Sequence, residues 1–396
     1  MVAASHPGWL CCQLGAREHY VVPRALQQSG LLSELITDLW IRPGSVLRSL
    51  RSGLAGRFHP ALSSARVSAS NASALTFALR SHITGATDWK LISQRNDWFQ
   101  RFVVDQLARD REPANSTVFA YSYAAERIFT LARERGWRTV LGQIDAGPVE
   151  EDIIAQQTPA ADSSWQRAPR EYWKRWHREC QLAQTIVVNS TWSRRSLVTA
   201  GVSEKKIRVI PLAFDPPADA HGFTRKYPDA FTNERPMRVL FLGQINLRKG
   251  AMQLFDAVKR MAGEPVEFWF VGPLQVDVPH ELNDKIKWFG VVPRNDVARY
   301  YRDADVFILP TLSDGFGLTQ LEAQAWKLPV IATPYCGDVV THGLNGMILD
   351  TVSAGTIAET LHHLLRSPET LQTLSENSRV DDRFSLQALA ASLSSL

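Results

Sequence analysis

The residues best suited to chemistry lie in one stretch, residues 310–322, with the sequence P-T-L-S-D-G-F-G-L-T-Q-L-E. The apolar run 306–309 before it has the length and composition of a buried parallel strand, and apolar residues recur at helical spacing over 318–328 after it. Gly315 and Gly317 lie between the two, where the lack of a Cβ lets backbone approach a ligand closely. We therefore expect a strand, a glycine loop and a helix.

A glycine loop that opens a helix is suited to binding an anion. The first N–H groups of a helix have no partner within it and its dipole is positive at this end, so both attract phosphate. Asp314 precedes the expected amides and Glu322 follows them, which places a carboxylate on each side of the anion. A nucleotide-sugar needs these parts: amides for the diphosphate and carboxylates for the ribose and sugar hydroxyls. The simpler interpretation is an ordinary unit of a parallel sheet with two solvated carboxylates.

Two further glycine-bounded segments could contribute to such a site. Residues 243–250, G-Q-I-N-L-R-K-G, follow an expected strand at 237–242, so Arg248 and Lys249 lie where cations would neutralise a diphosphate. Solvated surface charge is the alternative for both. Gly15 ends the first expected strand, at the edge where open sheets bind ligands, or it is a plain helix-entry glycine.

The order of expected elements predicts two α/β domains. Strands at 9–14, 35–40, 117–120, 139–144, 185–188 and 207–212 alternate with helices at 16–28, 124–135, 165–183 and 190–200 in the first domain. The helix 165–183 carries Tyr172, Trp173, Trp176 and His177, whose rings could hold a sugar, although core packing is the favoured reading. Strands at 267–271, 286–289 and 329–333, with helices at 296–303 and 354–366, belong to the second domain.

A proline-rich segment at 215–222, D-P-P-A-D-A-H-G, has no periodicity and marks the domain boundary. We predict a first domain over 1–214, a linker over 215–236, a second domain over 237–380 and a C-terminal helix over 381–396 that returns to the first domain. A length of 396 residues agrees with two cores.

Composition excludes several classes of protein. The chain is 45% apolar and 21% charged, and its net charge of +4 is too small to argue for nucleic acid. Cys11, Cys12, Cys180 and Cys336 form no C-x-x-C pair, so we expect reduced thiols in a cytoplasmic protein and no bound metal. No apolar run approaches the length of about 20 residues that spans a membrane, which predicts a soluble or peripheral protein.

One segment is charged with a single sign. Residues 39–87 contain no Asp or Glu but six arginines: Arg42, Arg48, Arg51, Arg57, Arg66 and Arg80. We read residues 42–80, punctuated by glycines such as Gly53, as an insertion of short helices on the ligand face. A basic and apolar insertion of this kind is suited to bind a phosphorylated or lipid-linked acceptor, or to contact the anionic inner face of a membrane peripherally. A solvated arginine surface is the alternative.

Four motifs, in this order, resemble those of the retaining family 4 glycosyltransferases, which have the GT-B fold. G-Q-I-N-L-R-K-G (243–250) is similar to the family's phosphate loop and K-W-F-G-V-V-P (287–293) to its base-binding segment. D-G-F-G-L-T-Q-L-E (314–322) resembles the family's E-x7-E pattern, and residues 334–346 resemble the segment that follows it. The resemblance covers residues 238–350 well and 186–211 weakly. It implies two doubly wound, Rossmann-like parallel-sheet domains that face each other across a cleft.

The resemblance also implies roles for individual residues. Lys249 and Arg248 would bind the donor diphosphate, the amides of Gly317 and Leu318 its distal phosphate, and Asp314 the transferred sugar. Glu322 would bind the ribose diol and Val291 would lie against the base. The remaining implied donor contacts are Gly15, Gly315, Phe316 and Thr319.

Three positions depart from the family pattern. Asp314 stands where the family usually has glutamate, and Gln244 stands where it usually has arginine, which places more weight on Arg248 and Lys249. Tyr121, Ser122 and Tyr123 occupy the place of a frequent histidine, so we assign no catalytic histidine.

The implied function is transfer of a sugar from a nucleotide-sugar, expected to be of the UDP or GDP class, to a saccharide, lipid-linked or small-molecule hydroxyl with retention of configuration. In the front-face mechanism of such enzymes the leaving phosphate accepts the acceptor's proton, so no protein base, metal or cofactor is needed. A non-catalytic GT-B subunit that binds a nucleotide-sugar, and an epimerase or phosphorylase of the same fold, are the alternatives. A dinucleotide dehydrogenase is disfavoured because no G-x-G-x-x-G follows the first strand.

Overall fold

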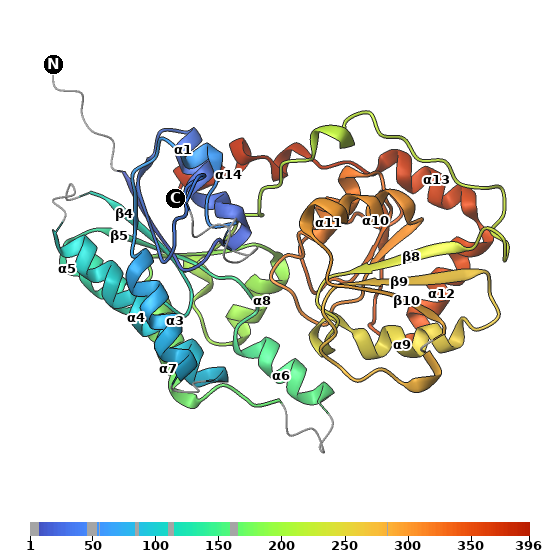
Figure 1. Ribbon diagram of the computed structural model, residues 1–396, viewed down its shortest axis with the longest axis horizontal. Coiled ribbons are helices and arrows are strands. Elements are labelled where there is room, and N and C mark those ends of the chain that lie inside the picture. The colour runs from blue at the N-terminus through green and yellow to red at the C-terminus, as the bar shows by residue number, and fades with distance from the viewer. Residues whose placement is uncertain are drawn as a thin grey trace.

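Two parallel sheets, each with helices on both faces, form two domains that lie side by side (Figure 1). The computed structural model describes residues 8–45, 54, 56–83, 87–109, 115–158, 165–282 and 284–396. Arg48, Arg51 and Gly53 of the expected arginine-rich insertion lie outside these residues. The prediction of two doubly wound α/β domains is confirmed.

The first sheet has seven strands in the order β3-β2-β1-β4-β5-β6-β7, and the second has six in the order β10-β9-β8-β11-β12-β13. Every neighbouring pair is parallel. The strands are β1 (Trp9–Gln13), β2 (Leu32–Thr37), β3 (Val67–Ala69), β4 (Thr117–Tyr121), β5 (Arg138–Gly142), β6 (Thr185–Val188), β7 (Ile207–Val209), β8 (Met237–Leu242), β9 (Val266–Val271), β10 (Ile286–Gly290), β11 (Val306–Leu309), β12 (Val330–Ala332) and β13 (Gly346–Ile348).

Many of these parallel strands are connected by α-helices, as crossover connections between parallel strands usually are. The α-helices are α1 (Val21–Gln28), α3 (Asn71–Ile83), α4 (Asp88–Arg109), α5 (Glu126–Glu134), α6 (Pro148–Gln157), α7 (Arg170–Leu182), α8 (Thr191–Thr199), α9 (Ala251–Arg260), α10 (Val297–Asp303), α11 (Thr319–Ala325), α12 (Ala354–Arg366), α13 (Pro368–Asn377) and α14 (Leu386–Ser394).

Each sheet has one point where the strand order reverses. In the first sheet this switch point lies between β1 and β4, and in the second it lies between β8 and β11. Loops leave neighbouring strands in opposite directions at a switch point, so a crevice opens at the carboxyl ends of those strands and ligands bind there. The loops after β8 and β11 are the two segments that carry Arg248, Lys249, Asp314 and the glycines.

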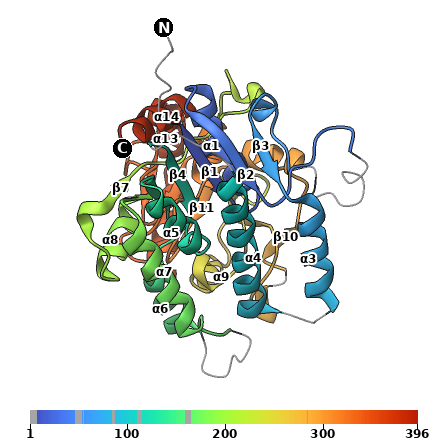
Figure 2. The same ribbon diagram turned by 90° about the vertical axis from the view of Figure 1, so that its left-hand side faces the viewer.

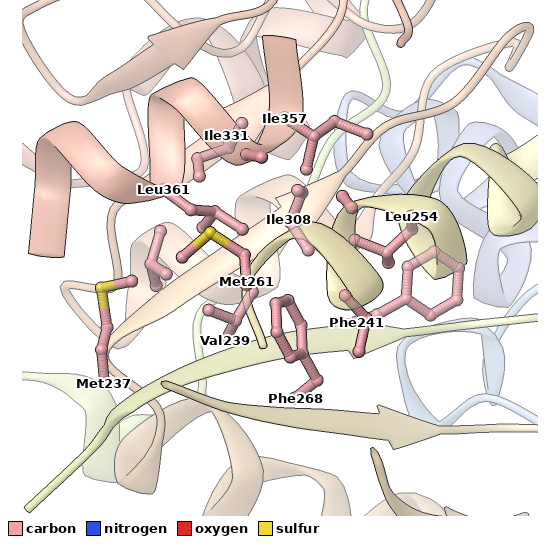
Figure 3. Close-up of a cluster of buried hydrophobic side chains, with 14 of the residues drawn as sticks. Met237, Val239, Phe241, Leu254, Met261, Phe268, Ile308, Ile331, Ile357 and Leu361 are labelled. Carbon is pink, nitrogen blue, oxygen red and sulfur yellow. The ribbon is translucent and has the colours of Figure 1, made fainter. Parts of the chain in front are cut away.

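The second domain is held together by apolar side chains between its sheet and the pair α9 and α12. Figure 3 shows Met237, Val239 and Phe241 of β8 with Phe268 of β9, facing Leu254 of α9. These side chains are almost fully buried, and burying each contributes about 1.5–3 kcal/mol. The strands β8 and β11 of this sheet therefore read as apolar runs, which is why their positions could be predicted.

Several elements of the first domain were not predicted. The expected insertion of short helices at 42–80 is wrong in part, because β3 lies in it and is followed by α3 and by α4, a helix of 22 residues. The helix α6, which begins at Pro148, was not predicted. The strand β13 and the helix α13 were also missed.

The predicted helix 16–28 is wrong at its start. Residues Arg17–Tyr20 form a 3-10 turn in which Glu18, His19 and Tyr20 have φ of 49°, 54° and 60°, and the regular helix α1 begins only at Val21. This left-handed backbone conformation is unfavourable in free energy for residues with a Cβ, so the surrounding structure must hold it in place.

The predicted helix 318–328 is shorter than its apolar spacing indicated. The helix α11 ends at Ala325, and Lys327 turns the chain with φ of 55° before β12 begins. Pro329 disfavours helical geometry at the residue before it, which explains the early end.

The chain passes between the domains twice, and the two passages touch. The amide of Phe214 donates to the carbonyl of Phe384 at 2.8 Å. Beyond Phe384, α14 packs against α1, and Leu389 and Leu393 join the first-domain core; Figures 1 and 2 both show α14 beside α1. The segment over 215–236 is packed against the second domain: Arg225 donates to the carbonyl of Tyr301 at 2.6 Å. Among the described residues, no helix combines the length and apolarity needed to cross a membrane.

Candidate active site

The glycine loop of residues 310–317 is shaped by two different constraints. Gly317 has φ of 77°, and a Cβ there would lie 2.9 Å from Cδ2 of Leu309. Gly315 faces the first domain, and a Cβ there would collide with the carbonyl oxygen of Ile144. Within the described chain, the amides of Gly317, Leu318 and Thr319 have no hydrogen-bond partner. The loop therefore presents free donors at the boundary between the domains.

The second cationic segment is pinned against this loop. The side chain of Asn246 accepts from the amide of Lys249 at 3.1 Å, which closes the turn before α9. Gly250 follows with φ of 72°, and a Cβ there would collide with the carbonyl of Pro310. The amide of Leu312 donates to the carbonyl of Arg248 at 2.9 Å. Backbone contacts thus fix the two loops of the switch point relative to each other.

The structure brings Arg248, Lys249 and Asp314 together. The ammonium of Lys249 donates to Oδ2 of Asp314, and Nη1 of Arg248 lies 3.9 Å from Oδ1. Burial raises the pKa of Asp314, but the two cations outweigh it and the pKa falls below its usual value. Asp314 is therefore ionised at neutral pH, and its charge is compensated from the β8 loop.

Glu150 of α6 is a first-domain residue in this cluster that the sequence did not reveal. Its Oε2 accepts from the hydroxyl of Ser313 at 2.8 Å, and its Oε1 lies 3.7 Å from Nε of Arg248. Trp192 of α8 donates to the same hydroxyl at 3.1 Å. Burial raises the pKa of Glu150 to about 7, although Arg248 opposes the rise. Pro148 after Gly147 is typical of a helix start, and this signal could have placed Glu150 in the first turn of a helix.

Glu322 lies in the first turn of α11 and is held from below. The hydroxyl of Tyr301, a residue that is 1% exposed, donates to Oε2 of Glu322 at 2.7 Å. Burial and the Glu322 carboxylate raise the pKa of Tyr301 well above its ordinary value, so the phenol stays protonated. This fixes the orientation of Glu322 and leaves its other oxygen for a ligand.

Three other predicted donor contacts lie in different surroundings. Gly15 is in the first domain, where its amide donates to Oδ1 of Asp38 at 2.9 Å. Val291 is 75% exposed after β10. Phe316 is 3% exposed and packs against Phe384, so its side chain belongs to the core between the domains. Their roles in binding a donor stay predictions.

A second hollow of about 320 Å³ lies in the first domain at its own switch point. Its walls follow β1, β4 and β5 and include Tyr121, Ser122 and Tyr123, the residues at the position of the family's histidine. We call it the first-domain pocket. Ile144 lines it and also touches Gly315, so the pocket borders the glycine loop.

Tyr123 is held in an unfavourable conformation in this pocket, with φ of 74°. The buried carboxylate of Glu179 accepts from the amides of Tyr123 and Ala125, each at 2.7 Å, and burial raises the pKa of Glu179 to about 7. Backbone strain that is supported in this way is found at functional sites. The core interpretation of helix α7 holds for Trp176, which is fully buried, whereas Tyr172 lines the pocket.

A metal site is not formed by the described residues, because no group of three or more His, Cys, Asp or Glu side chains converges. The four cysteines are buried and unpaired.

The fold and the two switch-point sites define the chain as a GT-B protein. A sucrose-phosphate synthase from Thermosynechococcus elongatus superposes with a TM-score of 0.69 at 17% identity, covering 98% of each chain. The Anabaena protein HepE, solved in complex with UDP, gives a TM-score of 0.61 at 16% identity and covers 98% of this chain and 99% of its own.

The second domain is also similar in sequence to known proteins. Residues 224–381 match the family model described as glycosyl transferases group 1. The amylovoran biosynthesis glycosyltransferase AmsK of Erwinia amylovora is 24% identical over 196 residues, which is 45% of this chain and 46% of AmsK. The chain spans about half the length of the curated relatives it matches.

Proposed function

We propose that the protein is a glycosyltransferase that moves a sugar from a nucleotide-sugar to an acceptor hydroxyl with retention of configuration. One observation carries the proposal: Arg248, Lys249 and the free amides of 317–319 converge at the switch point of the second sheet, beside a pocket at the switch point of the first. A diphosphate has the charge and geometry to bind the first group. The family match of the second domain supports the same reading.

In the proposed reaction the cations and amides act on the leaving group. As the bond between the sugar and the diphosphate lengthens, negative charge grows on the phosphate oxygens, and Arg248, Lys249 and the loop amides stabilise it. Glu322, oriented by Tyr301, binds the ribose diol. Asp314 binds a hydroxyl of the sugar once the diphosphate takes over the attraction of Lys249. In a front-face transfer the departing phosphate oxygen accepts the proton of the acceptor hydroxyl.

The proposal extends to the class of donor. Val291, exposed after β10, would lie against the base, and we propose a UDP- or GDP-sugar. The acceptor would be a saccharide, a lipid-linked sugar or a small-molecule hydroxyl in the first-domain pocket. CapM of Staphylococcus aureus, which is 28% identical over 169 residues, acts by its name in capsular polysaccharide biosynthesis, which favours a saccharide acceptor.

The test is direct. Calorimetry with UDP- and GDP-sugars should show binding of one of them, and product analysis by NMR should show an anomeric configuration equal to that of the donor. Binding of neither donor class would overturn the proposal, and an inverted product would overturn retention alone.

A non-catalytic subunit that binds a nucleotide-sugar is the second candidate, because Asp314 is occupied by Lys249 in the structure. This candidate predicts donor binding without transfer to any acceptor and without hydrolysis. Mixing the protein with a radiolabelled donor and an acceptor panel separates the two.

Peripheral membrane contact is supported only by the surface of α3. Leu75 and Leu79 are 41% and 59% exposed one helical turn apart, and Arg80 beside them is also exposed. Within the proposal this face meets an anionic bilayer. Sedimentation with phosphatidylglycerol vesicles, compared with phosphatidylcholine vesicles, would test this membrane contact. Equal sedimentation with both would overturn the proposal of contact with an anionic membrane.

A further inference from the structure

We propose that the first-domain pocket selects an acceptor whose ring carries a negative group, a phosphate or a carboxylate, and that Arg17 binds this group. The inference rests on the proposed function, since it names the acceptor class of the same reaction. It is carried by the charges that line the pocket, by its aromatic wall and by its distance from the glycine loop.

Arg17 is a partly buried cation that lines the first-domain pocket. Its guanidinium carbon lies 5.8 Å from the centre of the Tyr121 ring, and it forms no ion pair with any carboxylate in the described part of the chain. Its sequence neighbour Glu18 is engaged elsewhere, because the hydroxyl of Tyr121 donates to its Oε2 at 3.0 Å. Burial raises the pKa of Glu18, although the hydrogen bond from Tyr121 and the charge of Arg17 oppose the rise. A partly buried guanidinium of this kind is suited to hold a carboxylate or phosphate.

A second cation lines the same pocket. Nη2 of Arg95 lies 3.2 Å from Oδ2 of Asp38, but Nη1 of Arg57 lies 3.0 Å from Oδ1 of that carboxylate. Asp38 also accepts from the amide of Gly15. One buried carboxylate thus serves two arginines, and of these Arg95 lines the pocket together with Arg17.

One oxygen of Asp145, the carboxylate that lines the pocket, already accepts three hydrogen bonds. Oδ1 of Asp145 accepts from the hydroxyl of Tyr123 at 2.5 Å, from the side-chain amide of Gln143 at 2.8 Å and from the amide of Gly147 at 2.9 Å. These donors fix Asp145 on the side of β5, where it meets Ile144 and the glycine loop. An incoming anion would therefore meet Arg17 and Arg95, with Asp145 restricting where it can lie.

The remaining wall is suited to a sugar ring. The rings of Trp89 and Tyr172 lie 4.9 Å apart, and Tyr172 stacks on Tyr123 with centroids 5.0 Å apart. Aromatic faces of this kind pack against the C–H face of a sugar. Ser122, which is 3% exposed, lines the pocket with a hydroxyl that has no partner, so a donor and acceptor for a sugar hydroxyl is available.

The pocket is positioned for transfer. Ile144 lines it and its carbonyl touches Gly315, two residues before the free amide of Gly317. An acceptor ring against Tyr123 would therefore present a hydroxyl toward the bond that the proposed reaction breaks, with its anionic substituent directed away toward Arg17.

Calorimetry on the full chain saturated with UDP tests the inference, with glucose, glucose 6-phosphate and glucuronate as probes. We expect at least one charged probe to bind about ten times more tightly than glucose, or more, since charge-assisted hydrogen bonds contribute on this scale. The phosphate and carboxylate probes distinguish the two sources of charge. Arg17→Gln should remove the preference, whereas Arg101→Gln, an exposed arginine on α4 outside the pocket, should retain it.

Two controls keep the outcomes separate. UDP binding to Arg17→Gln should equal that of the wild type, which shows that the variant is folded, and Arg17→Lys should restore part of the preference. If neither charged probe binds more tightly than glucose while UDP binds normally, the anion inference is overturned and the proposed function stands. If UDP and both donor classes fail to bind, the proposed function is overturned, and the three probes measured without UDP still decide the anion site.

Discussion

Lys249 connects the loop after β8 to the loop after β11 and is the residue on which the proposed reaction depends most. Lys249→Met removes a cation whose interaction with the diphosphate strengthens in the transition state. We expect kcat/KM for transfer to fall by about 100-fold or more, as is usual when one such electrostatic group is lost.

The matched control is Lys259→Met, which removes an exposed lysine of α9. Its kcat/KM should stay within about twofold of the wild type, since exposed ion pairs contribute little. Equal losses in both variants would mean that Lys249 has no special part in catalysis.

Asp314 is a buried carboxylate whose charge depends on Lys249. Asp314→Ala leaves the ammonium of Lys249, 13% exposed, without its partner, and removal of one member of a buried pair costs about 3–5 kcal/mol. Urea denaturation followed by tryptophan fluorescence at pH 7 should show a loss of this size. The exposed Asp256→Ala serves as the control, and a loss no larger than in that variant would contradict the buried pair.

Glu150 should make stability depend on pH. Its pKa of about 7 in the folded chain lies above the ordinary 4.5, so between these values the folded state holds a proton that the unfolded state has lost. The stabilisation is complete below about pH 4.5 and is lost as the pH rises to about 7. Glu150→Gln should therefore lose less stability than the wild type over this range.

The measurement is the urea midpoint from pH 4.5 to 8 for wild type, Glu150→Gln and the exposed control Glu359→Gln. His19 contributes the opposite slope, because burial and Arg294 lower its pKa to about 4 and protonation opposes folding. Glu179 contributes the same slope as Glu150. The difference between variant and wild type isolates Glu150, and parallel pH curves would show that its carboxyl titrates normally.

At the scale of elements, the glycine loop offers the sharpest test. Gly317→Ala would keep φ near 77° with a Cβ 2.9 Å from Leu309, so we expect a loss of about 1–3 kcal/mol and weaker UDP binding. Gly343→Ala is the matched control, because Gly343 has φ of 73° but open space around it. The control measures the loss of stability due to backbone strain alone. Any additional loss of stability in Gly317→Ala is then due to the steric clash with Leu309. Equal effects on UDP binding would argue against the loop as the phosphate site.

The elements that could be predicted from the sequence are those whose signal is local. The strands β8 and β11 are apolar runs bounded by glycine or polar residues, and α12 has a regular apolar face, so their bounds match the prediction. The helix α4 was missed because its mixture of aromatic, charged and apolar residues has a weak period, and it packs on partners far away in sequence. The turn at Glu18 to Tyr20 is set by tertiary packing and has no glycine to announce it.

The residues of the candidate site also differ in whether a local signal in the sequence could reveal them. Lys249, Arg248, Asp314 and Glu322 follow strand ends in recognisable motifs, and the structure gathers the first three in one cluster. Glu150 and the pocket around Tyr123 come from the other domain, and their position depends on how the domains pack, which no spacing in the sequence encodes.

At the scale of the whole molecule, α14 joins the end of the second domain to the first. Leu393 is 1% exposed against the α1 cluster, and Leu393→Ala should cost about 2–5 kcal/mol through loss of burial and a cavity. Leu344→Ala, at a residue that is 49% exposed, is the control and should change stability by less than about 0.5 kcal/mol. Thermal denaturation of both variants measures this, and equal transitions would show that α14 is not part of the core.

The hydrogen bond between Phe214 and Phe384 has a mechanical consequence. A single connecting segment would let one domain rotate about it in any direction. Two connecting segments that are hydrogen-bonded at one point restrict the motion to rotation about that shared pivot. Such a pivot would bring the loops after β8 and β11 back to the same place on the first domain in each cycle. Cutting the chain between Ser378 and Phe384 would remove the covalent link between α14 and the second domain, so this restraint would be released and the register between donor and acceptor would become variable.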